Sequence, residues 1–444
     1  MSALPYNVGM IGFGTVGRGV EKLLREQANL YTQRLGRPLN LTHVLVRDPA
    51  KALAPAPDQP AAALDPAAVT ADPDAFFAGE FDLVIEVAGG LDPVGGYLHR
   101  ALAAGKHVVT ANKSLLAARG PELFADARKY GVSIAFEASC GGGIPCVTAL
   151  TAGLMANQIH GLYGILNGTC NYILTQMTRH GETYADALAG AKEKGYAEAD
   201  ETLDVSGADA AQKLAILASL AFGVRVTDDD VPRQGINTLD LDDVRFGDEL
   251  GYDMKLIAAA ERWPGQPFLS LHTAPCFIAK SEQLAQVHGS FNALSAVGHA
   301  VGHTMYYGRG AGQGPTASAI VADVFQTACG AYPLAFDRMK LTPDLHAPAQ
   351  LVEPDDVEGR WYLRVNALDV PGVVAQMTKA LGDRRISLSS LLQHDAPPDS
   401  EVVPVVITTH HARRGDLDAA AEWIARVPEV RSAPVIYRIL DLPD

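Results

Sequence analysis

Three glycines near the N-terminus restrict the fold of this chain more than any other feature. They stand in the sequence Gly12-Phe13-Gly14-Thr15-Val16-Gly17. A predicted apolar strand at 7–11 precedes them, and a predicted helix runs on from them through Val20 and Leu24. Such glycines allow a tight turn and close approach of the backbone to a ligand, and the N–H groups that open the helix can bind a pyrophosphate. Because strand and helix flank it, the pattern predicts a dinucleotide-binding turn, with a purely structural glycine turn as the alternative.

Further apolar segments follow at spacings that alternate strand with helix. Strands are predicted at 40–47, 81–87, 106–110 and 132–136, and helical patterns separate them. Continuous apolar strands of this kind are typical of a parallel sheet covered on both faces. The sequence therefore predicts an α/β, Rossmann-type, doubly wound domain over residues 1–139. The Ala- and Pro-rich residues Ala50 to Pro73 are predicted to form a surface loop with little regular structure.

The end of the second strand bears on the choice of cofactor. It reads Val46-Arg47-Asp48, with Lys51 close behind. An acidic residue here would bind the ribose 2′-hydroxyl of NAD, whereas an arginine can pair with the 2′-phosphate of NADP. We favour NADP because Arg47 comes first. NAD stays open because Asp48 is also in reach, and Arg47 as a solvated strand end is the remaining alternative.

A carboxylate and a lysine lie four residues apart in a strongly helical segment. Asp209 and Lys213 therefore share one helix face. The rest of this predicted helix, 209–222, is almost wholly apolar or small, so it should be buried on most sides. A buried lysine can hold a proton for a reaction, although a solvated surface pair is the simpler interpretation of the spacing alone. Residues 140–309, with mixed helices and strand-like pieces near 268–273, 277–279 and 300–307, are predicted to form an α+β substrate-binding, catalytic and dimerisation domain.

Composition excludes some classes of partner. The net charge of -15 argues against nucleic acid and against an anionic membrane surface, but a locally positive pocket could still bind an anionic cofactor. No run approaches the roughly 20 apolar residues that span a bilayer, and the chain enters a strand without room for a signal peptide, so we expect a cytoplasmic protein. The cysteine count is odd and no Cys-x-x-Cys pair occurs, which favours reduced thiols. His299 and His303 have metal-ligand spacing on a helix, but Gly298 and Gly302 interrupt the segment, and two unrelated polar positions are the better interpretation.

The C-terminal part of the chain is a separate module. Residues 341–359 are rich in Pro, Asp and Glu and are predicted to be a linker. Beyond them, over 360–444, we predict strand 361–367, helix 373–381, strands 386–394 and 402–410, helix 417–427 and strand 433–439. This βαββαβ order predicts a ferredoxin-like fold. The helix that starts near residue 316 is a candidate to complete the first domain, through residues 310–335.

Several motifs together carry a family resemblance. They are Gly12–Gly17, Thr110–Lys113, Glu137–Pro145, Gly164–Tyr172, Gly195–Lys213 and Gly308–Thr316. In this order they resemble homoserine dehydrogenase up to about residue 330. The tail, with Asp369-Val370-Pro371-Gly372-Val373, looks like an ACT regulatory domain.

The resemblance implies the NAD(P)-dependent, reversible interconversion of L-aspartate 4-semialdehyde and L-homoserine, on the way to threonine, methionine and isoleucine. The family's catalytic lysine falls on Lys213, and its substrate-binding carboxylates fall on Glu198 and Asp209. Lys113 matches a lysine close to cofactor and substrate, and Asp204 is expected to organise the loop or bridge water. The cofactor site further includes Gly195, Gly310 and Gly312. The family's sodium or potassium site falls on Glu137, Cys140, Gly142 and Ile144.

The ACT resemblance adds a regulatory expectation. In such modules the turn with Asp369, Pro371 and Gly372 lines an amino-acid site at a subunit interface, and threonine is the natural feedback inhibitor. A module that only mediates assembly is the alternative, and we expect a homodimer or homotetramer. Two other functions stay open, namely a non-catalytic NADP-sensing regulator and another amino-acid-linked oxidoreductase. A semialdehyde dehydrogenase of the second kind would need a thiolate nucleophile with a histidine base.

Overall fold

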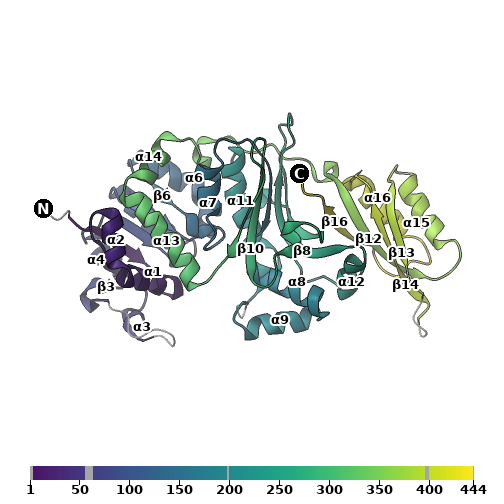
Figure 1. Cartoon of the computed structure of the whole chain (residues 1–444), viewed down its shortest axis with the longest axis horizontal. Helices are drawn as coiled ribbons and strands as arrows, with labels where there is room; N and C mark the ends of the chain where they lie inside the picture. Colours follow the sequence, from purple (N-terminus) through teal and green to yellow (C-terminus); the bar gives the residue numbers. More distant parts are fainter. Residues whose placement is uncertain (1–3, 56–63, 198–199, 396–399, 444) are drawn as a thin grey trace. The chain divides into compact units, whose positions relative to one another are not determined.

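The structure is a computed structural model, and it describes residues 4–55, 64–197, 200–395 and 400–443. The chain divides into two compact units, which are described separately. The first consists of Met1–Gly168, Asp209–Val231 and Phe291–Ala349, and the second of Thr169–Ala208, Pro232–Ser290 and Gln350–Asp444. Figure 1 labels the helices and strands of both.

The first unit contains a six-stranded parallel sheet, as the alternation of strand and helix predicts. Its strands run in the order β3-β2-β1-β4-β5-β6. They are β1 (Tyr6–Ile11), β2 (Leu39–Leu45), β3 (Val69–Thr70), β4 (Leu83–Glu86), β5 (His107–Thr110) and β6 (Ile134–Ala135). This is the Rossmann order, and its topological switch point lies between β1 and β4. The α/β doubly wound prediction is confirmed.

Helices cover this sheet and bury its apolar strands. They are α1 (Thr15–Glu26), α2 (Ala28–Leu35), α3 (Pro49–Leu53), α4 (Pro73–Phe77), α5 (Val94–Ala103), α6 (Lys113–Lys129), α13 (Gln313–Ala328) and α14 (Ala331–Arg338). Side chains of α13, including Ile320 and Val324, share one core with Val8 and Met10 of β1. Helices α1 and α13 lie side by side, and a Cβ on Gly19 would come within 3.1 Å of Ala317.

The segment predicted as a loop at 50–73 is more ordered than its composition indicates. Its described part contains most of α3, a 3-10 turn at Pro66–Ala68 and the short strand β3. Helix α3 begins where Asp48 caps it, with Pro49 in the first turn, which is a favourable start for even a five-residue helix. The prediction of an irregular loop is therefore wrong for these residues.

The first unit also contains a three-stranded antiparallel sheet and the long helix α11 (Ala208–Phe222). Strand β10 (Phe291–Gly298) lies between β7 (Ile159–Ile165) and β11 (Gly302–Arg309). His299 and His303 therefore flank the turn of a β-hairpin rather than lying on a helix, and the His303 ring contacts the Ser295 hydroxyl. Two short helical segments, α7 (Cys146–Thr148) and a π-helix at Ala149–Gly153, precede β7.

The second unit is built on a mixed, mostly antiparallel sheet that the C-terminal tail completes. The strand order is β8-β9-β16-β12-β14-β13. The strands are β8 (Tyr252–Glu261), β9 (Ser270–Ala279), β12 (Glu358–Leu368), β13 (Leu388–Gln393), β14 (Val402–Thr409) and β16 (Val435–Leu440), and the short β15 (Ala412–Arg413) pairs with β12. Strand β16 pairs in parallel with β9 and antiparallel with β12, so the tail sheet continues directly into β8 and β9.

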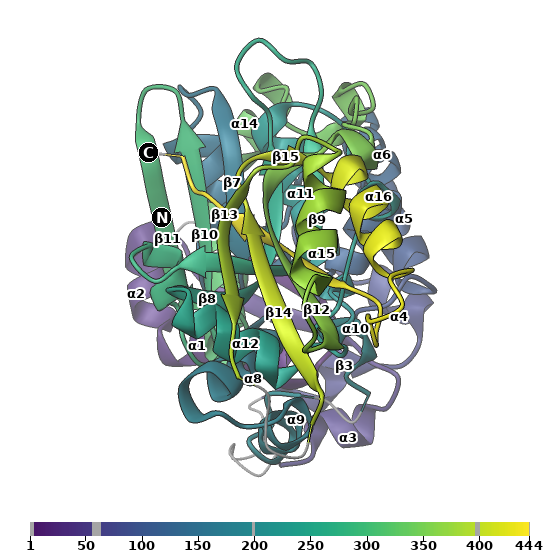
Figure 2. The same cartoon turned by 90° about the vertical axis from the view of Figure 1, so that its right-hand side faces the viewer.

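The tail has the βαββαβ order that the sequence predicts. Helices α15 (Val373–Gly382) and α16 (Arg414–Ile424) pack on one face of its sheet, as Figures 1 and 2 show. Between helices and sheet lies a compact core that includes Leu363, Val405, Met377 and Leu417. The other helices of this unit are α8 (Gly168–His180), α9 (Tyr184–Glu193), α10 (Thr202–Val205) and α12 (Leu241–Glu249).

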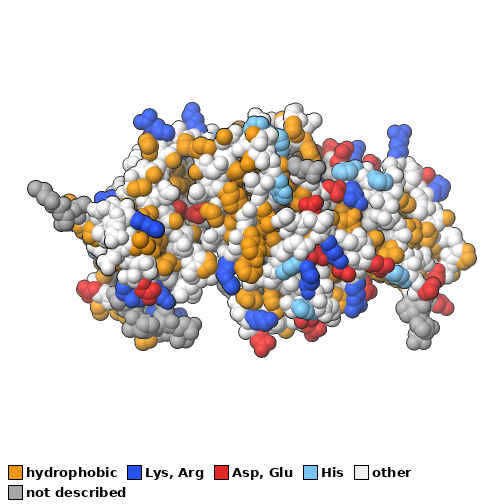
Figure 3. Space-filling model, viewed as in Figure 1, with side chains coloured by type: hydrophobic (Ala, Val, Ile, Leu, Met, Phe, Trp, Pro, Cys, Tyr) orange, Lys and Arg blue, Asp and Glu red, His pale blue; other side chains and the backbone are white. Residues whose placement is uncertain are grey.

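Two further observations concern the charges on the surface and the length of the apolar helices. On the face shown in Figure 3, the coloured acidic and basic side chains are mixed rather than gathered by sign. No single helix in the described parts of the chain is long and apolar enough to cross a membrane. The pair formed by α13 and Ala331–Leu345, bent by 78°, meets the length and composition criteria only when both are counted together.

Candidate active site

The N-terminal glycine turn has two glycines that packing requires and one that it does not. Gly12 has φ +95°, and a Cβ there would lie 2.6 Å from the Ala88 nitrogen. A Cβ on Gly17 would lie 2.8 Å from the Gly12 carbonyl oxygen. A Cβ on Gly14 would meet nothing within 4 Å, and Gly14 opens α1 without a side-chain cap. The turn therefore leaves an open face beside unpaired helix N–H groups, which fits the pyrophosphate of a dinucleotide.

A second glycine turn borders the first. Gly312 has φ +115° and opens α13, whose first residue, Gln313, donates from Nε2 to the Thr15 carbonyl oxygen at 3.0 Å. Gly310 leaves no room for a side chain, because a Cβ there would lie 2.0 Å from the Asn292 amide. Gly310 and Gly312 therefore stand in a tightly packed turn next to the residues assigned to the cofactor.

At the end of β2 the acidic and basic side chains have different tasks. The Asp48 carboxylate accepts a hydrogen bond from the Lys51 N–H at 3.1 Å and so caps α3. Arg47 and Lys51 are exposed. Asp48 thus serves as the cap of α3, whereas the side chains of Arg47 and Lys51 are exposed at the end of the strand.

A buried carboxylate, which the sequence analysis did not single out, organises the turn after β4. Glu86 is fully buried and accepts from the N–H groups of Ala88 and Gly89, each at 2.9 Å, and from the Thr110 hydroxyl at 2.6 Å. Burial raises the pKa of Glu86, and these hydrogen bonds oppose the rise. The turn that Glu86 holds packs on Gly12 at the switch point of the sheet.

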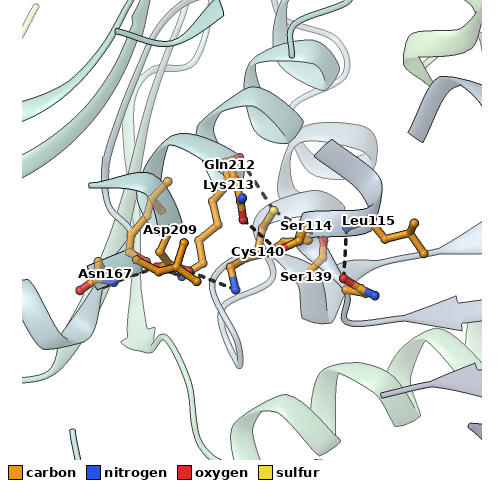
Figure 4. Close-up of polar contacts among 12 residues, drawn as sticks. Ser114, Leu115, Ser139, Cys140, Asn167, Asp209, Gln212 and Lys213 are labelled. Atoms are coloured by element: carbon orange, nitrogen blue, oxygen red, sulfur yellow. Dashed lines mark hydrogen bonds and ion pairs between the residues drawn. The ribbon is translucent and has the colours of Figure 1, made fainter. Parts of the chain in front are cut away.

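Two lysines from two helices meet around the Asp209 carboxylate. Figure 4 shows Asp209 with Lys213 and Asn167. The Lys213 Nζ lies 2.7 Å from Asp209 Oδ2 and 2.7 Å from the Leu166 carbonyl oxygen. The Lys113 Nζ lies 3.2 Å from Asp209 Oδ1, and the Asn167 amide donates to Oδ2 at 2.8 Å. The structure thus brings together Lys113, Asp209 and Lys213, and it adds Asn167, which the sequence analysis quoted within a motif but gave no role.

Local structure places each of these groups. Lys113 is the first residue of α6, where the Asn112 side chain caps the helix by accepting from the Leu115 N–H at 3.1 Å. This helix start follows β5 at the carboxyl edge of the parallel sheet, the same edge as the glycine turn. A hydrogen bond of 3.0 Å from the Ser114 hydroxyl to the Gln212 amide oxygen joins α6 to α11.

The electrostatics of the cluster keep Asp209 ionised. Burial alone would raise the pKa of this carboxyl group, but the charges of Lys213 and Lys113 and the hydrogen bonds from Lys213 and Asn167 lower it to about 2. The side chains of Asp209 and Lys213 are each 11% exposed and that of Lys113 is 32% exposed. The lysines therefore share a strong anionic partner at a site that keeps some access to solvent.

Other assigned residues belong to the second unit. Gly195 has φ +71° in the turn after α9, and Asp204 lies in α10, where its carbonyl oxygen accepts from the Cys170 thiol at 3.2 Å. Glu198 lies outside the described residues. Within the first unit the structure groups Lys113, Asp209 and Lys213, whereas Gly195 and Asp204 belong to the second unit.

The loop assigned to a monovalent cation is held by its own backbone. The two carboxylate oxygens of Glu137 accept from the N–H groups of Val147 at 2.8 Å and Thr148 at 2.7 Å. Asp323 accepts from the Glu137 N–H at 2.8 Å, and burial raises the pKa of both acids. Neither acid has an ion pair with a lysine or arginine within the described ranges. The loop thus contains one buried carboxylate and contacts a second, and oxygen is the ligand atom that hard cations prefer.

Backbone carbonyls would have to complete such a site. Cys140, Gly142 and Ile144 lie on the turn after Glu137, with φ +56° at Gly142, and the Ile144 carbonyl oxygen also accepts from the Cys146 N–H at 2.7 Å. Among the residues that the structure describes, no group of three or more His, Cys, Asp or Glu side chains could hold a metal ion.

The Cys140 thiol, which lies next to the lysine cluster, does not resemble a catalytic nucleophile. Cys140 is fully buried, and burial raises the pKa of its thiol to about 12. Its Sγ lies 3.9 Å from the Lys213 carbonyl oxygen. A nucleophilic cysteine needs a lowered pKa and access to substrate, so this site does not support thiolate chemistry.

The turn of the tail that was assigned to an amino-acid effector is open to solvent. Asp369, Pro371 and Gly372 are exposed, and Gly372 opens α15 with φ +94°. The Asp369 carboxylate accepts from the Gln393 side chain at 3.0 Å, which fixes the turn against β13.

Comparisons with known proteins agree with this architecture. Residues 12–137 match the family model "Homoserine dehydrogenase, NAD binding domain", residues 145–325 match "Homoserine dehydrogenase", and residues 361–429 match "ACT domain". The homoserine dehydrogenase of Pseudomonas aeruginosa is 39% identical over 439 residues, which cover 97% of this chain and 98% of that protein. The relative from Synechocystis sp. is 38% identical over 440 residues, 98% of this chain and 99% of that protein.

A solved structure gives the same answer. The homoserine dehydrogenase from Thiobacillus denitrificans superposes with a TM-score of 0.90 at 38% identity, covering 99% of this chain and 100% of that one. The resemblance drawn from the motifs is confirmed over the whole length. The chain therefore belongs to the homoserine dehydrogenase family and carries an ACT domain at its C-terminus.

Proposed function

We propose that Lys213 is the proton-transferring residue of this homoserine dehydrogenase and that Lys113 assists it. The enzyme interconverts L-aspartate 4-semialdehyde and L-homoserine in amino-acid biosynthesis. The observation that carries the proposal is the Lys213–Asp209–Lys113 cluster at the carboxyl edge of the nucleotide-binding sheet. When bound, the reduced nicotinamide supplies the hydride for the aldehyde carbon.

The chain's own groups then handle charge and proton. Negative charge develops on the carbonyl oxygen of the aldehyde, and an ammonium group beside that oxygen stabilises the charge and donates a proton to it. Lys213 suits this task because Asp209 and the Leu166 carbonyl oxygen hold its Nζ in one place. Lys113, more exposed, positions the reacting end of the substrate as a second cation.

The substrate also carries an ammonium group, which needs carboxylate partners. Asp209 is ionised well below neutral pH, because its pKa is lowered to about 2. Glu198 is proposed as the second partner from the family motif, and Asp204 as a residue that organises the same segment.

We also propose NADP as the preferred cofactor. Asp48 caps α3 and so is occupied, whereas Arg47 and Lys51 are exposed at the strand end where a 2′-phosphate would be bound. The glycines 12, 14 and 17 would hold the pyrophosphate, with Gly195, Gly310 and Gly312 as further walls of the pocket. NAD use would require the ribose 2′-hydroxyl to compete for Asp48.

We also propose a monovalent cation, an amino-acid effector and an oligomeric assembly. A sodium or potassium ion would neutralise the Glu137–Asp323 pair and take the carbonyl oxygens of residues 140, 142 and 144. Threonine would bind at the exposed turn of Asp369, Pro371 and Gly372, with its carboxylate at the start of α15. A homodimer or homotetramer in the cytoplasm is the expected form.

The decisive experiment is the reduction of aspartate semialdehyde with NADPH by the wild type, Lys213→Ala and Lys129→Ala. Lys129 lies exposed at the other end of α6 and serves as the matched lysine control. We expect kcat to fall by about a hundredfold or more in Lys213→Ala, with an unchanged circular dichroism spectrum and unchanged NADPH binding. Near-normal turnover by the folded variant would remove Lys213 from the mechanism. Cofactor binding without turnover in the wild type would instead favour the non-catalytic NADP sensor.

A further inference from the structure

Arg18, on helix α1, donates side-chain hydrogen bonds to the end of the short helix α3. Arg18 is only 9% exposed. Its Nη2 donates to three carbonyl oxygens at the end of α3, those of Lys51 at 3.1 Å, Ala52 at 2.9 Å and Ala54 at 2.9 Å. The last carbonyl groups of a helix have no partner within the helix and carry its negative partial charge. One guanidinium group thus satisfies the exposed end of a helix that is too short to be stable by itself.

The same side chain also touches the glycine turn. The guanidinium carbon of Arg18 lies 5.3 Å from the centre of the Phe13 ring. The backbone N–H of Arg18 makes the first helical hydrogen bond of α1, to the Gly14 carbonyl oxygen at 3.0 Å. Arg18 therefore joins two segments that are 30 or more residues apart in the sequence, namely the pyrophosphate turn and α3.

Helix α3 in turn determines where two cations stand. Arg47 immediately precedes the capping residue Asp48, and Lys51 lies in the helix itself. Both side chains are exposed, so neither is held by burial. Their positions relative to the glycine turn depend on how α3 is seated, and Arg18 makes the contacts that seat it.

We propose that Arg18 is a positioning residue for cofactor selectivity, which acts by fixing α3 so that Arg47 and Lys51 meet the 2′-phosphate of NADP. The inference rests on the proposed NADP preference. It assigns to Arg18 an effect mainly on the 2′-phosphate, because the hydrogen bonds of its guanidinium group go to the carbonyl oxygens of Lys51, Ala52 and Ala54. An arginine that only stabilised the domain would affect NADPH and NADH alike.

The test compares Arg18→Met with Arg25→Met in the full-length protein. Arg25 lies on the same helix, carries the same charge and is 45% exposed, with only a local ion pair to Glu21. Dissociation constants for NADPH and NADH are measured by nucleotide fluorescence, and those for 2′,5′-ADP and 5′-AMP by calorimetry. We expect Arg18→Met to weaken NADPH and 2′,5′-ADP about tenfold and to change NADH and 5′-AMP less than twofold. Arg25→Met should change none of them.

Two further readouts separate positioning from direct contact. Hydrogen exchange without any nucleotide should show faster exchange in residues 51–54 of Arg18→Met. In a double-mutant cycle with Arg47→Gln, the two losses in NADPH affinity should be strongly non-additive, because Arg18 acts through the segment that carries Arg47. Additive losses, equal losses for both cofactors, or unchanged exchange in α3 would each overturn the inference.

The NADPH and NADH affinities of the wild type test the proposed NADP preference, on which the role of Arg18 depends. If the wild type binds NADPH and NADH equally, the NADP preference fails and the role of Arg18 fails with it. If the wild type prefers NADPH and Arg18→Met keeps that preference, only the role of Arg18 fails. If Arg18→Met does not fold, Arg18→Lys is used instead. Lysine keeps the charge and the aliphatic part of the side chain but lacks the planar guanidinium group. We then expect a smaller, equally selective loss of affinity for NADPH and 2′,5′-ADP.

Discussion

Replacing Asp209 by asparagine would leave the ammonium groups of Lys113 and Lys213 without the carboxylate that they share. Asparagine keeps the size of the side chain and one oxygen that can accept from Lys213. It removes the negative charge that lies 2.7 Å from one lysine and 3.2 Å from the other. The variant therefore isolates the charge of Asp209 from its shape.

The pKa of Asp209 sets the magnitude. Burial opposes ionisation, but the two lysines outweigh it, so that the pKa falls from 3.8 to about 2 in the folded protein. At roughly 1.4 kcal/mol for each pH unit, this difference is worth about 2 kcal/mol of folding free energy. Because the folded pKa is the lower one, this stability is complete above about pH 4 and is lost as the pH falls through 2. At pH 3, about half of this stability should remain.

The measurement must report on the first unit. Tryptophan fluorescence is unsuitable because Trp263, Trp361 and Trp423 all lie in the second unit. Hydrogen exchange of peptides from α11 and the start of α6 gives the local free energy of opening directly. We expect Asp209→Asn to lower it by about 2 to 3 kcal/mol at pH 7 and by about half as much at pH 3. Asp126→Asn is the control. Asp126 also lies on α6, is more exposed than Asp209, and pairs with His99 of α5.

Activity provides the second half of this prediction. Loss of the ionised carboxylate should raise the KM for aspartate semialdehyde and lower kcat/KM by about a hundredfold, since both lysine position and the substrate's ammonium partner are affected. An Asp209→Asn enzyme with the wild type's exchange at both pH values would show that the lysines do not depend on Asp209. The same difference in free energy at pH 3 and pH 7 would show that its pKa is not depressed.

Two other residues of the nucleotide site give contrasting predictions. Gly14→Ala should leave the melting temperature nearly unchanged, because Gly14 has φ -83° and an added Cβ would meet nothing within 4 Å. It should nevertheless weaken NADPH binding about tenfold or more in a fluorescence titration. Equal binding by the variant and the wild type would mean that no ligand approaches this glycine. Glu86→Gln can accept at one oxygen only, so either the Thr110 hydroxyl or the N–H groups of Ala88 and Gly89 lose their partner, and we expect a melting temperature lower by several degrees together with weaker binding of both cofactors. Wild-type melting of Glu86→Gln would contradict the role assigned to this network.

Sequence patterns predict those parts of the molecule in which local periodicity and burial agree. The strands of the first sheet other than β3, and all six predicted elements of the tail, are of this kind. Strand β8 is different, because its run Leu256-Ile257-Ala258-Ala259-Ala260 is buried on both faces and rich in alanine, so neither alternation nor β-branching marks it. Strand β9 contains Pro275 and was split into two predicted pieces, although it is one strand from 270 to 279.

The site shows the same division at the level of single residues. The spacing of Asp209 and Lys213 is local, so the shared helix face can be predicted from the sequence. Their partners Lys113, Leu166 and Asn167 come from distant segments, and only folding brings them within hydrogen-bonding distance. Glu86 and Arg18 were missed for the related reason that a buried charge has no sequence signature unless its partners are known. A glutamate at the end of an apolar strand, followed by Gly89 and Gly90, is the one local signal that could have indicated the Glu86 network.

The tail is built into the second unit rather than attached to it by a flexible connection. Arg364 of β12 binds both carboxylate oxygens of Asp243 on α12, at 2.6 and 2.9 Å, and the Tyr362 hydroxyl donates to the same carboxylate at 2.9 Å. Burying such a pair is costly unless every donor is satisfied, and here three donors converge on a fully buried acid. The strand that carries Arg364 also pairs with β16, which continues the sheet into β9. A ligand that moved the tail sheet would therefore move α12 as well, and α12 follows the segment whose Ile236 N–H donates to the Val205 carbonyl oxygen of α10 at 2.8 Å. An amino acid that bound to the tail would thus have a hydrogen-bonded route from the tail sheet to the helix that contains Asp204.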